Sequence, residues 1–161
     1  MIRILFVIAL LVLGVTVAIA QRAAAVRAER TLAAQSCQDV INTRQMLMKN
    51  SAAAGKTGVA MIKGEMPFDL AKAKEIFATF AEDAGKMPAL FPDCSRTGEH
   101  DNAAGEIWDK PDEFKAAIAK FAADVKAAQD NIKDLDTFKA GFQTVGKDCG
   151  SCHEKFRVKQ S

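Results

Sequence analysis

The chain has 161 residues and a formal net charge of +2, and 49% of its residues are hydrophobic and 26% charged. These proportions suit a single soluble globular domain and exclude a disordered chain, a collagen-like repeat and a protein with many membrane spans. The near balance of 22 basic and 20 acidic residues argues against a nucleic-acid partner, which would need a clustered basic face. Tyrosine is absent, aromatic residues make up only 7% of the chain and alanine is abundant, so the composition favours helices over strands.

The amino terminus has the pattern of an export signal. A basic start precedes an unbroken apolar run over residues 4–20, and the run ends in Ala-Ile-Ala, the small-x-small pattern that signal peptidases read. We therefore expect residues 1–20 to be a signal peptide that is cleaved before Gln21. The run of 17 residues is also at the lower limit of a membrane span, and arginines follow it, so an uncleaved anchor remains the alternative. Both alternatives put the rest of the chain outside the cytoplasm.

Residues 21–36 are rich in alanine and arginine and are expected to form a helical spacer ahead of a folded domain over residues 37–161. The first helix of that domain is predicted over residues 36–62, and it ends at a lysine followed by Gly64, as helix ends prefer. A second helix starts after Asp69, which is a good N-cap. Its apolar stripe consists of Leu70, Ala73, Phe77, Phe80, Ala84 and Met87.

Two further helices follow a polar loop that is expected over residues 92–107. Pro111 and the acidic residues beside it suit the first turn of a helix, and the stripe of this third helix is Phe114, Ile118, Phe121, Val125, Ala128 and Ile132. The fourth helix is predicted to start near Asp134, with a stripe of Leu135, Phe138, Phe142, Val145, Cys149, Cys152 and Phe156. Four amphipathic helices joined by short connections predict an all-α, antiparallel four-helix bundle.

The first helix differs from the other three because small and polar residues occupy its expected inward positions. These positions are Ile41, Arg44, Met48, Ser51, Gly55, Val59 and Ile62. A bundle packed to normal density would be left with a void beside them, so we expect a group other than a side chain to fill that space. Gly55 and Gly58, which each cost a helix up to about 1 kcal/mol relative to alanine, support this expectation. The alternative is close contact between helices through small residues.

One motif carries specific chemistry. Residues 149–153 read Cys-Gly-Ser-Cys-His, which is the C-x-x-C-H signature of c-type haem attachment. On a helix Cys149, Cys152 and His153 share one face, so two thioethers can hold the porphyrin while the imidazole reaches its iron. The alternatives are a redox dithiol, expected near a strand–helix turn, a structural disulfide, and a zinc half-site that would need a further ligand such as His100. Together with the export signal, the motif predicts one covalent haem c and its iron.

A C-x-x-C-H motif near the carboxyl end of a four-helix chain, followed by Phe156-Arg157, resembles the class II cytochromes c, the cytochrome c′ family. The resemblance extends over residues 38–159 and includes Arg44-Gln45, the turn at residues 63–69 and Ile107-Trp108. It implies a haem held within the bundle, covalently attached to the two motif cysteines. The proximal iron ligand would be His153, and the first helix would supply the residue on the distal side. The haem would then fill the void expected beside the first helix.

The resemblance puts the distal position one turn after Arg44, at Met48. Gas-binding members of the family usually have an apolar residue such as leucine there and a five-coordinate iron, whereas in low-spin members a methionine binds the iron as sixth ligand. Met46 lies about 200° around the helix from Met48, so the two side chains cannot both point inward. The alternative reading of Met48 is a flexible core residue with no bond to iron.

Arg44 and Arg157 resemble the family's partners for the haem propionates, a role that suits the preference of guanidinium groups for carboxylates. The alternative for each arginine is a solvated surface charge. We expect His100 to lie on the surface and Trp108 to pack at the end of the bundle.

Cys37 and Cys94 are expected to form a disulfide. They lie at the start of the first helix and just past the second, and these ends are neighbours in an antiparallel pair. An oxidising compartment favours the bond. The expectation comes from the topology, because the family does not generally have this cysteine pair.

Two functions follow from these features. The first is a periplasmic carrier of single electrons in which His153 and Met48 fill both axial positions of the iron, and the second is a protein that binds nitric oxide or carbon monoxide at an open iron. An enzyme is not expected, because the first helix offers no distal acid–base group. The carrier would exchange electrons with other redox proteins, for which the near-neutral charge provides little electrostatic steering. A membrane contact is expected only with an uncleaved anchor, and a homodimer is implied by the resemblance alone.

Overall fold

A computed structural model describes residues 2–98 and 101–158, with side chains from residue 21 onward except at residue 23. The chain divides into two compact units, Met1–Cys37 and Gln38–Ser161. Among the described residues, no helix is both long enough and apolar enough to cross a membrane. The predicted signal peptide over residues 1–20 lies outside the described side chains.

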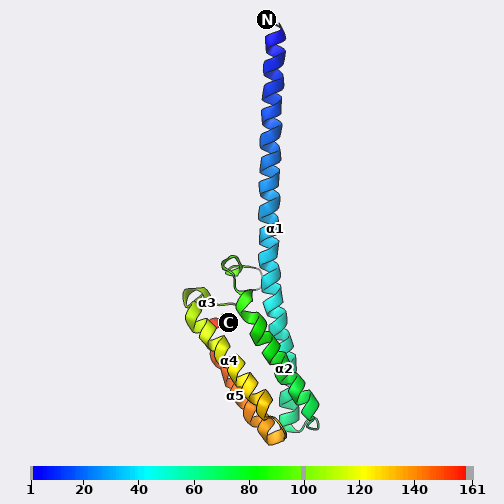
Figure 1. Cartoon of the computed structure of the whole chain (residues 1–161), viewed down its shortest axis with the longest axis vertical. Helices are drawn as coiled ribbons and strands as arrows, with labels where there is room; N and C mark the ends of the chain where they lie inside the picture. Colours follow the sequence, from blue (N-terminus) through cyan, green and yellow to red (C-terminus); the bar gives the residue numbers. More distant parts are fainter. Residues whose placement is uncertain (1, 99–100, 159–161) are drawn as a thin grey trace. The chain divides into compact units, whose positions relative to one another are not determined.

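The second unit is an all-α four-helix bundle, as the sequence predicts (Figure 1). Its long helices are the carboxyl-terminal part of α1 (Ile2–Lys63), α2 (Leu70–Lys86), α4 (Pro111–Asn131) and α5 (Leu135–Phe156). They run in alternating directions in Figure 1, and α4 packs against both α2 and α5. The connection from α2 to α4 contains the short helices η1 (Met87–Leu90), η2 (Asp93–Ser95) and α3 (Glu106–Asp109). The described residues contain no strand beyond an isolated bridge between Ala103 and Arg157.

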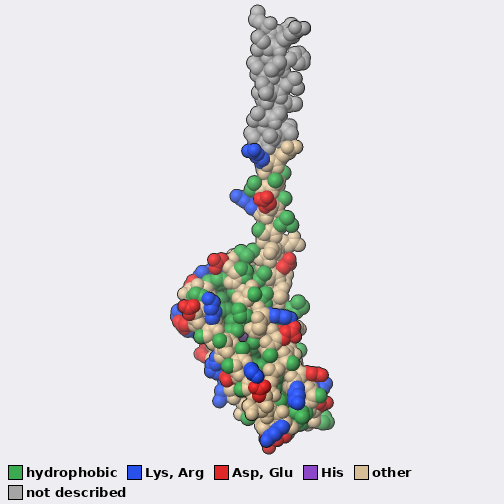
Figure 2. Space-filling model, in the orientation of Figure 1, with side chains coloured by type: hydrophobic (Ala, Val, Ile, Leu, Met, Phe, Trp, Pro, Cys, Tyr) green, Lys and Arg blue, Asp and Glu red, His purple; other side chains and the backbone are tan. Residues whose placement is uncertain are grey.

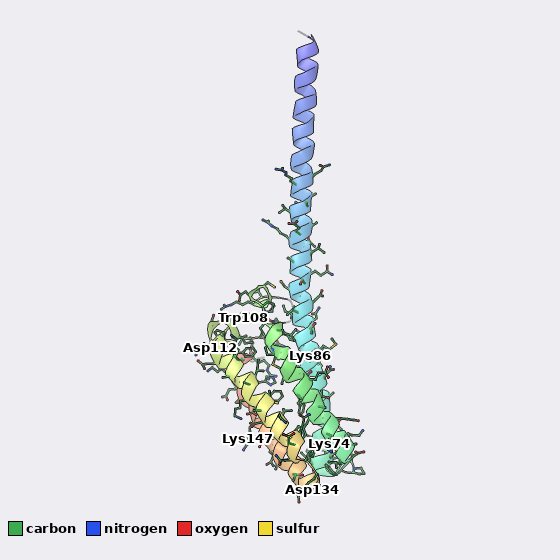
Figure 3. The ribbon with its side chains drawn as sticks, in the orientation of Figure 1. Lys74, Lys86, Trp108, Asp112, Asp134 and Lys147 are labelled. Carbon is green, nitrogen blue, oxygen red and sulfur yellow. The ribbon has the colours of Figure 1, made fainter. Side chains whose placement is uncertain are left out.

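Local sequence signals account for the helix ends. The Asp69 carboxylate accepts a hydrogen bond from the Lys72 amide at 3.0 Å and caps α2. Asp134, at the turn between α4 and α5 in Figure 3, forms a capping box with Thr137 through bonds of 2.8 and 3.1 Å. After α1 the backbone of Gly64 takes a φ of 74°, a left-handed conformation that glycine adopts without strain.

The connection between α2 and α4 is more ordered than the polar loop predicted over residues 92–107. Ser95 in η2 is fully buried, and Ile107 in α3 is also buried. The indole of Trp108, a residue of α3, donates a hydrogen bond to the Phe91 carbonyl at 3.2 Å, and Trp108 lies at one end of the bundle, as expected (Figure 3). Sequence polarity alone missed these contacts because they depend on which parts of the loop meet the helix ends.

The interior of the bundle contains two separate apolar clusters. The turn-end cluster lies toward the α1–α2 and α4–α5 turns and consists of Met61, Ala73, Ile76, Phe77, Phe80, Val125, Ala128, Ile132, Phe138 and Val145. The loop-end cluster lies toward α3 and consists of Ile107, Phe114, Ile118 and Phe156. The apolar core is therefore interrupted part-way along the helices, at a level that we call the gap.

The inward face of α1 departs from the predicted stripe in its last turns. Val59 was expected to face inward but is 38% exposed, whereas Met61 is 1% exposed. The stripe instead passes through Gly58, which is buried. A Cβ atom on Gly58 would clash with the ring of Phe142 on α5. The absent side chain lets α5 approach the α1 backbone, and this approach determines which side of the helix is covered.

Replacement of Gly58 by alanine should therefore destabilise the protein, by about 1–3 kcal/mol, because the ring of Phe142 must move. That ring is packed against Phe80 and Phe138, with centroid distances of 6.4 and 5.4 Å. The control is Gly85→Ala on α2, where an added Cβ meets no atom within 4 Å and the gain in helix propensity should stabilise by up to about 1 kcal/mol. Urea denaturation of both variants measures the difference, and a stabilising Gly58→Ala would contradict the close approach.

Cys37 and Cys94 are both disulfide-bonded, in agreement with the predicted bond between them. The bond would close a loop of about 56 residues and contribute roughly 4 kcal/mol in the chain-entropy model. Alkylation of the unfolded, haem-loaded protein should therefore add no alkyl group before reduction and two after it, as read by intact mass. Two alkylated cysteines without reduction would refute the bond.

Candidate haem-binding site

The C-x-x-C-H motif lies in the last two turns of α5 and straddles the gap. Cys149 packs against the turn-end cluster and Cys152 against the loop-end cluster. Both side chains are free thiols and half-buried, and His153 is half-buried beside them. The two cysteines that the sequence assigns to haem attachment thus mark the two edges of the interruption in the core.

The surroundings of all three motif side chains favour their uncharged forms. Burial raises the pKa of the Cys149 and Cys152 thiols, and the charge of Asp148 raises that of Cys149 further. Burial and the positive charge of Arg157 lower the pKa of His153. A neutral imidazole retains the lone pair that an iron ligand requires.

Two methionines of α1 lie at and beside the predicted distal position. Met48 is half-buried, whereas Met46 is 56% exposed, so only one of the two thioethers faces the interior. Gly55 is also half-buried, yet a Cβ atom there would meet nothing within 4 Å. Close contact between helices therefore occurs at Gly58, and the void expected beside the small residues of α1 stays a prediction.

Two buried carboxylates at the gap escaped the sequence analysis. Asp83 on α2 is 3% exposed and accepts a hydrogen bond from the Ser51 hydroxyl on α1 at 2.5 Å. Asp148 on α5 is 6% exposed and pairs with Lys120 at 2.5 Å, and its Oδ2 atom has no hydrogen-bond partner among the described residues. The available signal was positional, because each aspartate lies three residues after a buried member of an apolar stripe.

These residues fit a covalently bound haem. Two free thiols and one neutral imidazole on one helix face are the donor set that the C-x-x-C-H motif requires. The apolar core is interrupted between Cys149 and Cys152, and a Cβ atom on Gly55 would meet no atom within 4 Å. Within residues 2–98 and 101–158, no three His, Cys, Asp or Glu side chains are grouped to hold a bare metal ion, and His100 lies outside the described residues.

Arg44 is buried in a network with the connection between α2 and α4. Its guanidinium donates to the Leu90 carbonyl at 3.0 Å and to the Ser95 hydroxyl and carbonyl at 2.8 and 2.9 Å. It also pairs with the Asp101 carboxylate at 2.5 Å and lies 4.8 Å above the Phe91 ring. The carboxylate partner of Arg44 in this structure is thus a side chain of the chain itself, and its role toward a haem propionate stays a prediction.

Arg157 ends α5 and is exposed. Its positive charge acts on His153 four residues earlier, and among the described residues it forms no ion pair. Its predicted contact with a propionate also stays a prediction.

Removal of the Arg44 side chain should cost about 3–5 kcal/mol of stability, because Asp101 would remain buried without its counter-charge. The matched control is Arg96→Ala, which removes an exposed pair with Asp109 and should cost at most about 1 kcal/mol. Thermal and urea unfolding of the two variants give the comparison. Equal losses would show that the Arg44 network is no stronger than a surface ion pair.

Comparison with known proteins agrees with this site. A model of the family described as Cytochrome C′ matches residues 39–157. A cytochrome c′ of Rhodopseudomonas palustris (strain ATCC BAA-98 / CGA009) is 42% identical over 123 residues, which cover 76% of this chain and 84% of that protein. Cytochrome c-556 of the same strain is 38% identical over 127 residues, which cover 76% and 85%.

A solved structure of cytochrome c′ from Rhodopseudomonas palustris superimposes with a TM-score of 0.73 at 42% identity, covering 76% of this chain and 98% of the other. Sequence, fold and donor set thus agree over the whole bundle. The chain belongs to the cytochrome c′ family of class II c-type cytochromes, whose members carry covalently attached haem c.

Proposed function

We propose that this chain is a periplasmic carrier of single electrons, with His153 and Met48 as the two axial ligands of its haem iron. The observation that carries the proposal is that Met48 on α1 is half-buried, while Met46, two residues earlier on the same helix, is exposed. Met48 is the same residue that the resemblance puts at the distal position. The expected export signal supports the periplasmic location.

Each motif side chain has a defined task in this proposal. Cys149 and Cys152 hold the porphyrin through thioether bonds, and His153 supplies a neutral nitrogen ligand because its pKa is lowered. The bound haem c supplies a one-electron redox centre. The turn-end and loop-end clusters exclude water on either side of the gap, and this low dielectric strengthens the electrostatic effects there.

Methionine as the second axial ligand would favour electron transfer over ligand binding. Methionine–histidine ligation raises the reduction potential, and a thioether in the sixth position leaves no site for a substrate. On the face shown in Figure 2, basic and acidic side chains are interspersed over the bundle. Such a surface suits transient contacts with redox proteins without long-range steering.

The second candidate function is binding of nitric oxide or carbon monoxide at a five-coordinate iron. The observation that favours it is the unfilled space beside Gly55, which could receive a small ligand on the α1 side. In that case Met48 would be a core residue that shields the iron without bonding to it.

Replacement of Met48 by alanine distinguishes the two candidates. The variant should keep its covalent haem, because Cys149, Cys152 and His153 are intact, but its ferric spectrum should become high-spin. Its reduction potential should fall, since the thioether favours the ferrous state, and the ferrous form should bind carbon monoxide. Optical spectra and redox titration measure these changes.

The control for this experiment is Met46→Ala, which removes an exposed thioether from the same helix two residues away and should leave spectra and potential unchanged. A Met48→Ala protein with the parent's ferric and ferrous spectra would refute methionine ligation. A parent protein that is already high-spin and binds carbon monoxide would support the gas-binding function instead.

A further inference from the structure

Asp83 lies where α2 crosses the gap. Phe80, three residues before it, belongs to the turn-end cluster, and Met87, four residues after it, packs against the loop-end cluster. On α5 the same transition occurs between Cys149 and Cys152. A buried carboxyl is therefore present at the level of the bundle where the motif attaches haem.

One hydrogen bond links Asp83 to the helix turn that carries Met48. The Ser51 hydroxyl donates to Asp83 Oδ2 at 2.5 Å, and Ser51 lies three residues after Met48, on the same face of α1. Asp83 forms no ion pair among the described residues, since Lys86, the basic residue nearest in sequence, binds Glu82 instead. A buried carboxyl with a single neutral partner is a costly arrangement, which an amide or an apolar side chain would avoid.

The charged groups around Asp83 act on its pKa in opposite directions, so its ionisation depends on the charge within the gap. Burial raises the pKa of Asp83 and the Ser51 hydrogen bond lowers it, while Glu82 and Lys86 act in opposite directions from the same helix. From α1 the group that faces it is the neutral Ser51 hydroxyl. On α5 the ionisable groups at the same level are Asp148 and His153, whose pKa is lowered. On α4 they are Lys120 and Asp124. Lys120 forms ion pairs with both Asp124 and Asp148.

We propose that Asp83 is a redox-linked proton-binding group, which takes up one proton from solvent when the haem iron gains one electron and releases it on oxidation. The electron comes from a protein redox partner, and the proton converts the carboxylate to the carboxylic acid without forming a bond to iron. Reduction removes one positive charge from the gap, so the carboxylate loses an attraction and its proton affinity rises. Because linkage is reciprocal, protonation of Asp83 raises the reduction potential.

This inference rests on the haem of the proposed function but not on Met48 as its ligand. The test is a redox titration of the haem-loaded protein as a function of pH. The parent should show a potential that falls as pH rises through an interval, and a tenfold difference in the proton affinity of Asp83 between the two oxidation states corresponds to a fall of about 59 mV. Asp83→Asn should lack that fall, whereas Asp130→Asn, which changes an exposed aspartate on α4, should retain it.

Two further readouts keep a structural effect distinct from a proton-binding one. Ser51→Ala should shift the interval to higher pH, since its hydrogen bond holds the pKa of Asp83 down. A reduced-minus-oxidised infrared spectrum should show a carboxylic-acid carbonyl band that is lost in Asp83→Asn. An unchanged pH slope and band in Asp83→Asn overturns the inference, and the ferric spectrum recorded on the same samples reports separately on Met48 ligation.

Discussion

The apolar core of the bundle is not continuous. Its apolar core separates into a turn-end cluster and a loop-end cluster, and Cys149 packs against one while Cys152 packs against the other. Since protein interiors are otherwise packed to the density of organic crystals, this interruption is the constraint to which the rest of the structure is adjusted. The small residues of α1, the neutral donor set on α5 and the two buried aspartates all border the gap. A flat apolar group held by Cys149 and Cys152 would lie between the two clusters.

Most of the fold could be predicted from the sequence because it depends on local signals. The stripes of α2, α4 and α5, the caps at Asp69 and Asp134, and the glycine after α1 act over a few residues each. The C-x-x-C-H motif is equally local, since helical spacing alone puts its three side chains on one face. Met48 was separated from Met46 by the same argument, and the exposure of Met46 agrees with it.

The remaining features depend on contacts between distant segments, which periodicity does not report. Val59 was expected inside, but the approach of Phe142 to Gly58 turns the covered face of α1 toward Met61. The partner of Arg44 could not be predicted because Asp101 is 57 positions away in a loop that sequence polarity described only as exposed. The burial of Asp83 and Asp148 has no sequence signal beyond their spacing from the apolar stripes.

Arg44 also determines how the segment after α2 would meet another molecule. Its guanidinium holds the carbonyls of Leu90 and Ser95, so this stretch of backbone is fixed to α1. Ordering a flexible surface loop is one of the entropic costs that limit affinity between proteins. A partner that docks on this stretch would find its shape already set. Binding there would carry no entropic cost for ordering this loop. Such a surface suits brief and repeated contact.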